Sequence, residues 1–213
     1  MLKVERLAVF IGTANILREV TLHVPPGSMC GLIGRNGAGK TTFIRSVMGL
    51  TKVRSGQIDF DQKNLLKVNP HKRTHIGIGY MPEDRGLVPQ FTAEENIRLP
   101  AWASGMKDAD TRLEWIYKMM PEVEDFATRK ASQLSGGQGK MVAMARSLMS
   151  GKKLLLLDEP FEGLAPALAR RLAEVLSNLK DEGLSVLVAE SNEKHVADLL
   201  DTIFVIERGS IQS

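Results

Sequence analysis

The sequence lacks most features that mark secreted, membrane-spanning or nucleic-acid-binding chains. Its only cysteine, Cys30, excludes an internal disulfide and suits a reducing compartment. No apolar run approaches the ~20 residues that a helix needs to cross a bilayer. The net charge of +3 is too small to favour nucleic acid as a direct partner. Residues 1–5 show no signal-peptide pattern, so we expect a cytoplasmic protein whose membrane role would come through a partner.

What is present alternates between strand and helix patterns, as in an α/β fold. Alternating apolar and polar residues predict antiparallel strands at 2–9, 16–24 and 56–61. Apolar runs predict further strands, buried ones in a parallel sheet among them, at 29–33, 75–81, 154–157, 185–189 and 202–206. Helices are expected at 43–48, 111–120, 166–182 and 192–200. We therefore expect a parallel sheet with right-handed crossovers, flanked by an antiparallel sheet.

The middle third of the chain differs from the rest because strand patterns are missing from it. Thr92 and Glu95 form a Thr-x-x-Glu capping box, which predicts the start of a helix. We predict one domain over 1–213, in which 1–86 and 150–213 form the core with its antiparallel sheet. Residues 87–149 are then an inserted helical subdomain.

Residues 34–42, GRNGAGKTT, fit the G-x-x-x-x-G-K-[ST] phosphate loop at every fixed position. Glycines allow successive N–H groups to point at phosphate oxygens, and the following helix adds the positive end of its dipole. Lys40 is expected to reach the β- and γ-phosphates, and the Thr41 hydroxyl to ligate Mg²⁺. We predict a nucleoside-triphosphate site made by Gly34, Arg35, Asn36, Gly37, Ala38, Gly39, Lys40, Thr41 and Thr42.

A pair of carboxylates follows the apolar run 154–157. Asp158 at the end of this strand is placed to hold Mg²⁺, directly or through water. Glu159, the next residue, can accept a proton from an attacking water. The alternative is that both are helix-capping or solvated charges, which their place between an apolar strand and Pro160 disfavours.

The stretch 134–138, LSGGQ, narrows the function further. Together with the phosphate loop and LLLLDEP, it resembles the ATP-binding subunits of ABC transporters, and the resemblance covers essentially the whole chain. It implies an ATPase of the phosphate-loop NTPase (RecA-like) fold, with ATP and Mg²⁺ as cofactors. In that family the LSGGQ loop of one subunit closes on the γ-phosphate held by a second subunit. The loop residues that this implies are Ser135, Gly136, Gly137 and Gln138.

The resemblance also implies partners and a branch of the family. Two ATP-binding subunits, identical or related, would pair head to tail and drive transmembrane permease subunits at the inner face of the cell membrane. The stretches 82–96, PEDRGLVPQFTAEEN, and 162–166, EGLAP, resemble importers of branched-chain or other hydrophobic amino acids. Urea or short amides are the alternative cargo.

Several positions depart from the general family pattern or have two interpretations. Glu83 stands where the family usually has a glutamine near Mg²⁺, and we expect a metal-proximal role for it. Ser191 replaces the usual switch histidine; it either bonds phosphate during catalysis or caps a helix, and the nearest histidine is His195. Phe10 either stacks on adenine or belongs to the core. Lys140 replaces the usual Gln or Arg after the signature, and its sequence context indicates no role.

Other functions remain open at the level of sequence. A soluble ABC-type ATPase acting on ribosomes or DNA is one alternative, although the chain has one ATPase unit and neither a coiled-coil insert nor a basic tail. A regulatory subunit that hydrolyses ATP weakly is another, suggested by Ser191. A small-molecule kinase would leave LSGGQ unexplained.

Overall fold

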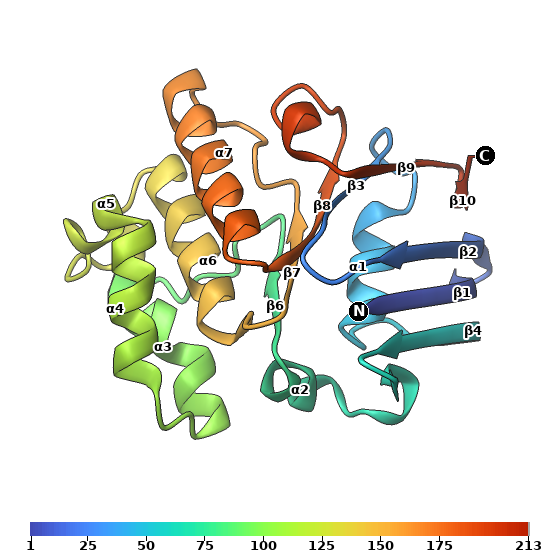
Figure 1. Cartoon of the computed structure of the whole chain (residues 1–213), viewed down its shortest axis with the longest axis horizontal. Coiled ribbons are helices and arrows are strands. Elements are labelled where there is room, and N and C mark those ends of the chain that lie inside the picture. Colours follow the sequence, from blue (N-terminus) through green and yellow to red (C-terminus); the bar gives the residue numbers. More distant parts are fainter. Residues whose placement is uncertain (213) are drawn as a thin grey trace.

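The larger of two sheets is built from the apolar runs of the sequence. The computed structural model describes residues 1–212 (Figure 1). The strands of this sheet are β3 (Met29–Ile33), β6 (Ile78–Met81), β7 (Leu154–Asp158), β8 (Ser185–Glu190), β9 (Thr202–Glu207) and β10 (Ser210–Ile211). Their order is β10-β9-β3-β8-β7-β6, and only β10 pairs antiparallel with its neighbour. The predicted parallel core is therefore confirmed.

The second sheet is antiparallel, as predicted. It contains β1 (Leu2–Ile11), β2 (Ala14–Val24), β4 (Val53–Phe60) and β5 (Lys63–Asn64), in the order β2-β1-β4-β5. Its strands lie beside α1, on the right of Figure 1.

One helix, α1, lies between the two sheets, and the longer helices cover the other face of the parallel sheet (Figure 1). The helices are α1 (Lys40–Val47), α2 (Pro70–Arg73), α3 (Ala93–Ser104), α4 (Ala109–Met119), α5 (Pro121–Glu124), α6 (Gly136–Ser150) and α7 (Pro166–Asp181). Short 3₁₀ segments lie at Leu65–Lys67, Thr74–Ile76, Ala131–Gln133 and Ala197–Leu199. No helix within residues 1–212 combines the length and apolarity needed to cross a bilayer.

The expected helical region over 87–149 is present, on the left of Figure 1, and contains no strand. Thr92 and Glu95 form the predicted capping box at the start of α3. The last helix of the region, α6, packs against both α3 and β6 of the parallel sheet. The division into 1–86 with 150–213 and 87–149 stays our proposal, with α6 as the element that joins the two parts.

Alternate residues of the buried strands face two different apolar cores. On β7, Leu155 and Leu157 pack with the helical side, whereas Leu154 and Leu156 pack with α1 and the antiparallel sheet. A strand buried on both faces needs apolar side chains at every position, which explains the uninterrupted run of four leucines. Packing in the two cores fixes the positions of the carboxyl ends of β3, β7 and β8 relative to one another.

Three predicted elements differ clearly in extent from the structure. The strand expected at 56–61 is β4 and begins earlier, at Val53. The strand expected at 75–81 begins at Ile78, because a 3₁₀ turn ends at Gly77 with a φ of 94°. The helix expected at 192–200 is reduced to the single 3₁₀ turn Ala197–Leu199. There, the Asn192 side chain accepts a hydrogen bond from the Lys194 N–H at 3.1 Å, which is a local alternative to helical hydrogen bonding.

Candidate nucleotide site

The predicted phosphate loop connects β3 to α1. The backbone turns into the helix at Gly39, whose φ of 114° a side chain would strain, and a Cβ there would lie 2.8 Å from Leu17. No side chain caps the first turn of α1. Its N–H groups are therefore available to a ligand, and the helix dipole favours an anion there.

Lys40 is buried inside this loop. Its ammonium donates to the carbonyl oxygen of Gly34, and it forms an ion pair with Glu159 at 3.0 Å. A longer contact of 3.4 Å joins it to the Ser191 hydroxyl. The ammonium thus lies among three groups drawn from the loop and from the ends of two neighbouring strands. A phosphate in the loop would meet this cation directly.

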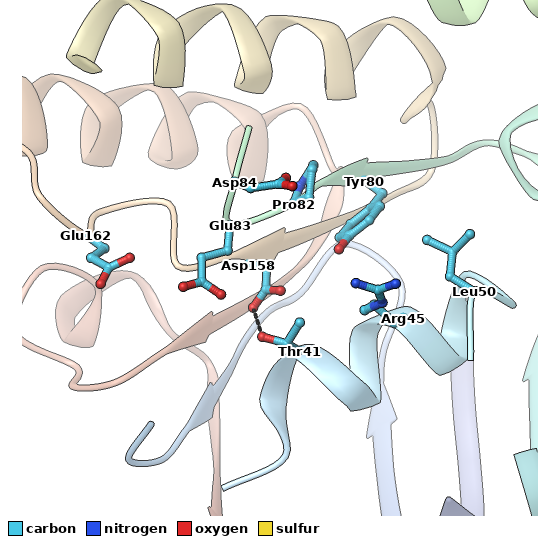
Figure 2. Close-up of a pocket in the computed structure, with 9 residues that line it drawn as sticks. All are labelled: Thr41, Arg45, Leu50, Tyr80, Pro82, Glu83, Asp84, Asp158 and Glu162. Carbon is cyan, nitrogen blue, oxygen red and sulfur yellow. Dashed lines mark hydrogen bonds between the residues drawn. The ribbon is translucent and has the colours of Figure 1, made fainter. Parts of the chain in front are cut away.

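The carboxyl end of β7 brings Asp158 beside Thr41. The Thr41 hydroxyl donates to Asp158 Oδ1 at 3.2 Å (Figure 2). Asp158 Oδ2 is the one buried side-chain N or O atom in residues 1–212 without a hydrogen-bond partner. Burial raises the pKa of Asp158 to about 6 from 3.8. An unpartnered buried carboxylate oxygen beside a hydroxyl fits the oxygen ligands that Mg²⁺ prefers.

Within residues 1–212, no cluster of three or more His, Cys, Asp or Glu side chains could hold a metal by itself.

Glu159 occupies a strained backbone position directly after Asp158. Its φ is 48°, in the left-handed region that a non-glycine residue rarely adopts. Burial alone would raise the pKa of Glu159. Hydrogen bonds with Glu190 and Ser191, together with the Lys40 ammonium, outweigh burial and leave the pKa below its ordinary value. The carboxylate is therefore ionised and able to accept a proton.

Ser191 lies in this network rather than at a helix start. Its hydroxyl and N–H contact Glu159 at 2.6 and 3.2 Å, and its hydroxyl also lies 2.7 Å from Asn36 of the phosphate loop. No helix begins at Ser191, so the helix-cap interpretation was wrong. His195 does not reach this network through a helical turn; its ring stacks on Phe161 with a centroid separation of 5.6 Å.

Sequence reasoning missed Glu190, which ends β8. It is buried, accepts a hydrogen bond from the Phe161 N–H at 2.9 Å and shares a hydrogen bond with Glu159. Burial, followed by the hydrogen bond with Glu159, raises the pKa of Glu190 to about 8. Its signal was present as a carboxylate closing an apolar strand, the same pattern that identified Asp158.

Two cavities adjoin the phosphate loop. One has a volume of about 420 Å³, and the other, shown in Figure 2, about 560 Å³. Thr41 and Glu83 line both, which places Glu83 near the predicted metal ligands. The smaller cavity is also lined by Lys40 and Glu159.

The residue predicted to stack on adenine and the exposed signature residues lie outside both cavities. Phe10 is 42% exposed and lines neither cavity, whereas Ile16 of β2, which sequence reasoning missed, lines the smaller one. The signature residues Ser135 and Gly136 are exposed and line neither cavity. A single chain therefore brings the phosphate loop, Asp158, Glu159 and Ser191 together, but it leaves the signature loop apart.

Comparison with known proteins places this geometry in a family. A family model described as ABC transporter matches residues 17–162. The chain is 31% identical over 211 residues to the high-affinity branched-chain amino acid transport ATP-binding protein BraG of Pseudomonas aeruginosa, covering 99% of this chain and 91% of BraG. It is 29% identical over 213 residues to the lipopolysaccharide export system ATP-binding protein LptB of Haemophilus influenzae, covering 99% of this chain and 88% of LptB.

A solved structure extends the likeness to the fold. The dimeric post-hydrolysis state of the ATP-binding cassette MJ0796, bound to ADP and Pi, matches with a TM-score of 0.87 at 25% identity. The match covers 100% of this chain and 97% of that chain.

Proposed function

The chain belongs to the ATP-binding subunits of ABC transporters and hydrolyses ATP to drive transport, and we propose that it powers an importer of branched-chain or other hydrophobic amino acids. The observation that carries the catalytic assignment is the contact network around Lys40. That network joins the phosphate loop to Glu159 and Ser191, and Asp158 lies beside it through Thr41.

Each residue of this network has a role that its contacts support. Lys40 and the loop N–H groups bind the β- and γ-phosphates. Glu159 accepts the proton of a water whose oxygen attacks the γ-phosphorus. The bond from that phosphorus to the β–γ bridging oxygen breaks, and ADP and phosphate leave. Ser191 holds the Glu159 carboxylate through two hydrogen bonds.

Asp158 and Thr41 are the residues that would hold Mg²⁺, with Glu83 near them. Mg²⁺ bound there would neutralise charge on the β- and γ-phosphate oxygens. Asp158 Oδ2 supports this assignment because it lacks a protein hydrogen-bond partner.

The exposed signature loop supports a composite site. We assign Ser135, Gly136, Gly137 and Gln138 to the γ-phosphate bound by a second ATP-binding subunit in a head-to-tail dimer, which the dimeric MJ0796 relative supports. Phe10 is assigned to adenine from its exposure on the antiparallel sheet. Permease subunits would dock near 83–96, which places the protein on the cytoplasmic face of a membrane without direct contact with nucleic acid.

The cargo assignment is supported by BraG and by the stretches 82–96 and 162–166. LptB, at nearly the same identity, favours export of a lipid as the second candidate. The two can be separated in the source cells. Replacement of the natural chain by the Glu159→Gln variant should abolish uptake of labelled leucine while the chain still binds ATP.

A Lys52→Ala replacement is the matched control, because Lys52 is exposed and lies outside both cavities. Unchanged leucine uptake in Glu159→Gln cells would contradict the amino-acid cargo. Unchanged ATP hydrolysis by the purified Glu159→Gln variant would contradict the catalytic assignment itself.

A further inference from the structure

Lys140 is a buried cation that the catalytic assignment leaves without a role. It lies in the second turn of α6, two residues after the signature stretch, and is 8% exposed. Burial lowers its pKa, while the charges of Glu162, Glu190 and Glu159 oppose that effect. No ion pair joins it to a carboxylate in residues 1–212. A buried ammonium costs free energy unless its bonding compensates for lost water.

The bond that Lys140 does make is to the main chain of the proposed base. Its Nζ donates to the carbonyl oxygen of Glu159 at 2.7 Å, in the buried interior. The same carbonyl accepts the Glu162 N–H at 3.3 Å, and the Glu159 N–H donates to Ala189 at 2.9 Å. The peptide groups on both sides of Glu159 are thus held by hydrogen bonds.

The Lys140 hydrogen bond acts on a residue whose backbone conformation is strained. The φ of 48° at Glu159 sets the direction in which its side chain leaves the strand end. Such a conformation persists only where surrounding contacts hold it. If the Lys140 bond is lost, only the longer 3.3 Å bond from the Glu162 N–H holds this carbonyl. The peptide after Glu159 is then less restrained, and the carboxylate can shift relative to the phosphate loop.

We propose that Lys140 is a positioning residue, which holds the Glu159 carboxylate in line for water activation by fixing the Glu159 main chain from α6. The inference rests on the proposed role of Glu159. The same hydrogen bond ties Glu159 to α6, the helix whose first turn carries the signature loop.

The test is a double-mutant cycle on hydrolysis by the purified chain. Lys140→Met keeps an unbranched side chain of similar length and removes the donor. We expect its rate of ATP hydrolysis at saturation to fall about tenfold, with ATP affinity unchanged within twofold. Lys152→Met removes the same charge from an exposed pair with Asp108, and should keep the wild-type rate.

The cycle separates positioning from a general structural role. In single-turnover hydrolysis, Glu159→Gln and the double variant Glu159→Gln/Lys140→Met should have the same residual rate, because Lys140 acts through Glu159. Additive losses, or an unchanged rate in Lys140→Met, would overturn the inference while leaving the catalytic assignment intact. An unchanged rate in Glu159→Gln alone would overturn both. If Lys140→Met does not fold, Lys140→Leu, which also lacks a donor, takes its place in the cycle.

Discussion

Two glycine-rich turns in this chain each lead into a helix, and they differ in what satisfies the free N–H groups of the first turn. At α1 the turn is the phosphate loop, and no side chain caps the helix. At α6 the turn is the signature loop, and Ser135 and Gln138 form a capping box with contacts of 3.2 and 3.0 Å. The first helix start leaves its N–H groups to a ligand, whereas at the second the capping box satisfies the N–H groups of Ser135 and Gln138.

The two loops also differ in burial. Lys40 of the phosphate loop is buried among Glu159, Ser191 and loop carbonyls, while Ser135 is exposed. The Ser135 hydroxyl accepts a hydrogen bond from the Gln138 N–H and keeps its own proton for donation. One loop is thus built to bind phosphate within a single chain. The other is stable while it faces solvent and can still donate to a phosphate brought by a second chain.

The largest effect is expected on ATP affinity, from a substitution in the buried phosphate loop. Lys40→Ala removes the ammonium from the phosphate loop and leaves Glu159 without its ion-pair partner. A charge-assisted contact to phosphate is worth about 3 kcal/mol, so ATP affinity should fall about 100-fold. Calorimetric titration with ATP measures it, with the exposed Lys52→Ala as control. Equal affinities in the two variants would contradict the binding role of Lys40.

Asp158→Asn tests whether the buried Asp158 carboxylate, near the phosphate loop, lowers stability and binds the metal. The pKa of about 6 lies above the ordinary 3.8, so the folded chain binds more protons, and stability is lost as pH rises between those values. Asparagine removes the buried charge, so the free energy of unfolding at pH 7 should rise by about 3 kcal/mol.

The functional cost of Asp158→Asn appears in ATP titrations with and without Mg²⁺. We expect affinity with Mg²⁺ to fall about tenfold, and affinity in a chelator to stay unchanged. A less stable variant would contradict the buried-charge argument, and an affinity that falls equally in both conditions would refute the metal role.

Ser135→Ala tests the exposed signature loop, and Thr92 provides a matched control. Thr92→Ala removes the corresponding capping box at α3, where no nucleotide role is proposed. Each substitution should lower stability by about 1 kcal/mol. Only Ser135→Ala should also lower the rate of ATP hydrolysis, by about tenfold, without changing ATP affinity of the single chain. Equal hydrolysis rates in the two variants would mean that Ser135 is only a helix cap.

The smallest effect concerns Glu190. Its pKa of about 8 exceeds the ordinary 4.5, so the folded chain holds a proton that the unfolded chain releases, and stability falls as pH rises across that window. Glu190→Gln removes this loss, so its Tm should exceed that of the natural chain by a margin that grows from pH 5 to 8. Glu207→Gln, at an exposed residue, should show no such trend. A margin that stays constant from pH 5 to 8 would show that Glu190 is ionised in the folded chain.

The sequence predicted features that depend on residues close together in the chain, and it missed most features that depend on distant residues. The phosphate loop, the run ending at Asp158 and the capping box of Thr92 are local patterns, and the fold preserves them. The Ser135–Gln138 box was also readable as Ser-x-x-Gln but was missed.

The other misses depend on segments far apart in sequence. Ser191 meets Asn36 across 155 positions, and Lys140 meets the Glu159 carbonyl across a helix–strand boundary. The helix expected after Ser191 failed because the Asn192 side chain provides a local turn that helical periodicity does not reveal.

The central claim is that the two loops complete one site only when a second ATP-binding subunit supplies the signature, and its simplest form has two copies of this chain. Sedimentation of the Glu159→Gln variant, with and without Mg-ATP, tests it most directly. The account predicts a 23.4 kDa species without nucleotide and one of twice that mass with Mg-ATP, and it predicts that Lys40→Ala abolishes the shift. A single 23.4 kDa species at saturating Mg-ATP, or the same dimer in its absence, would contradict the claim.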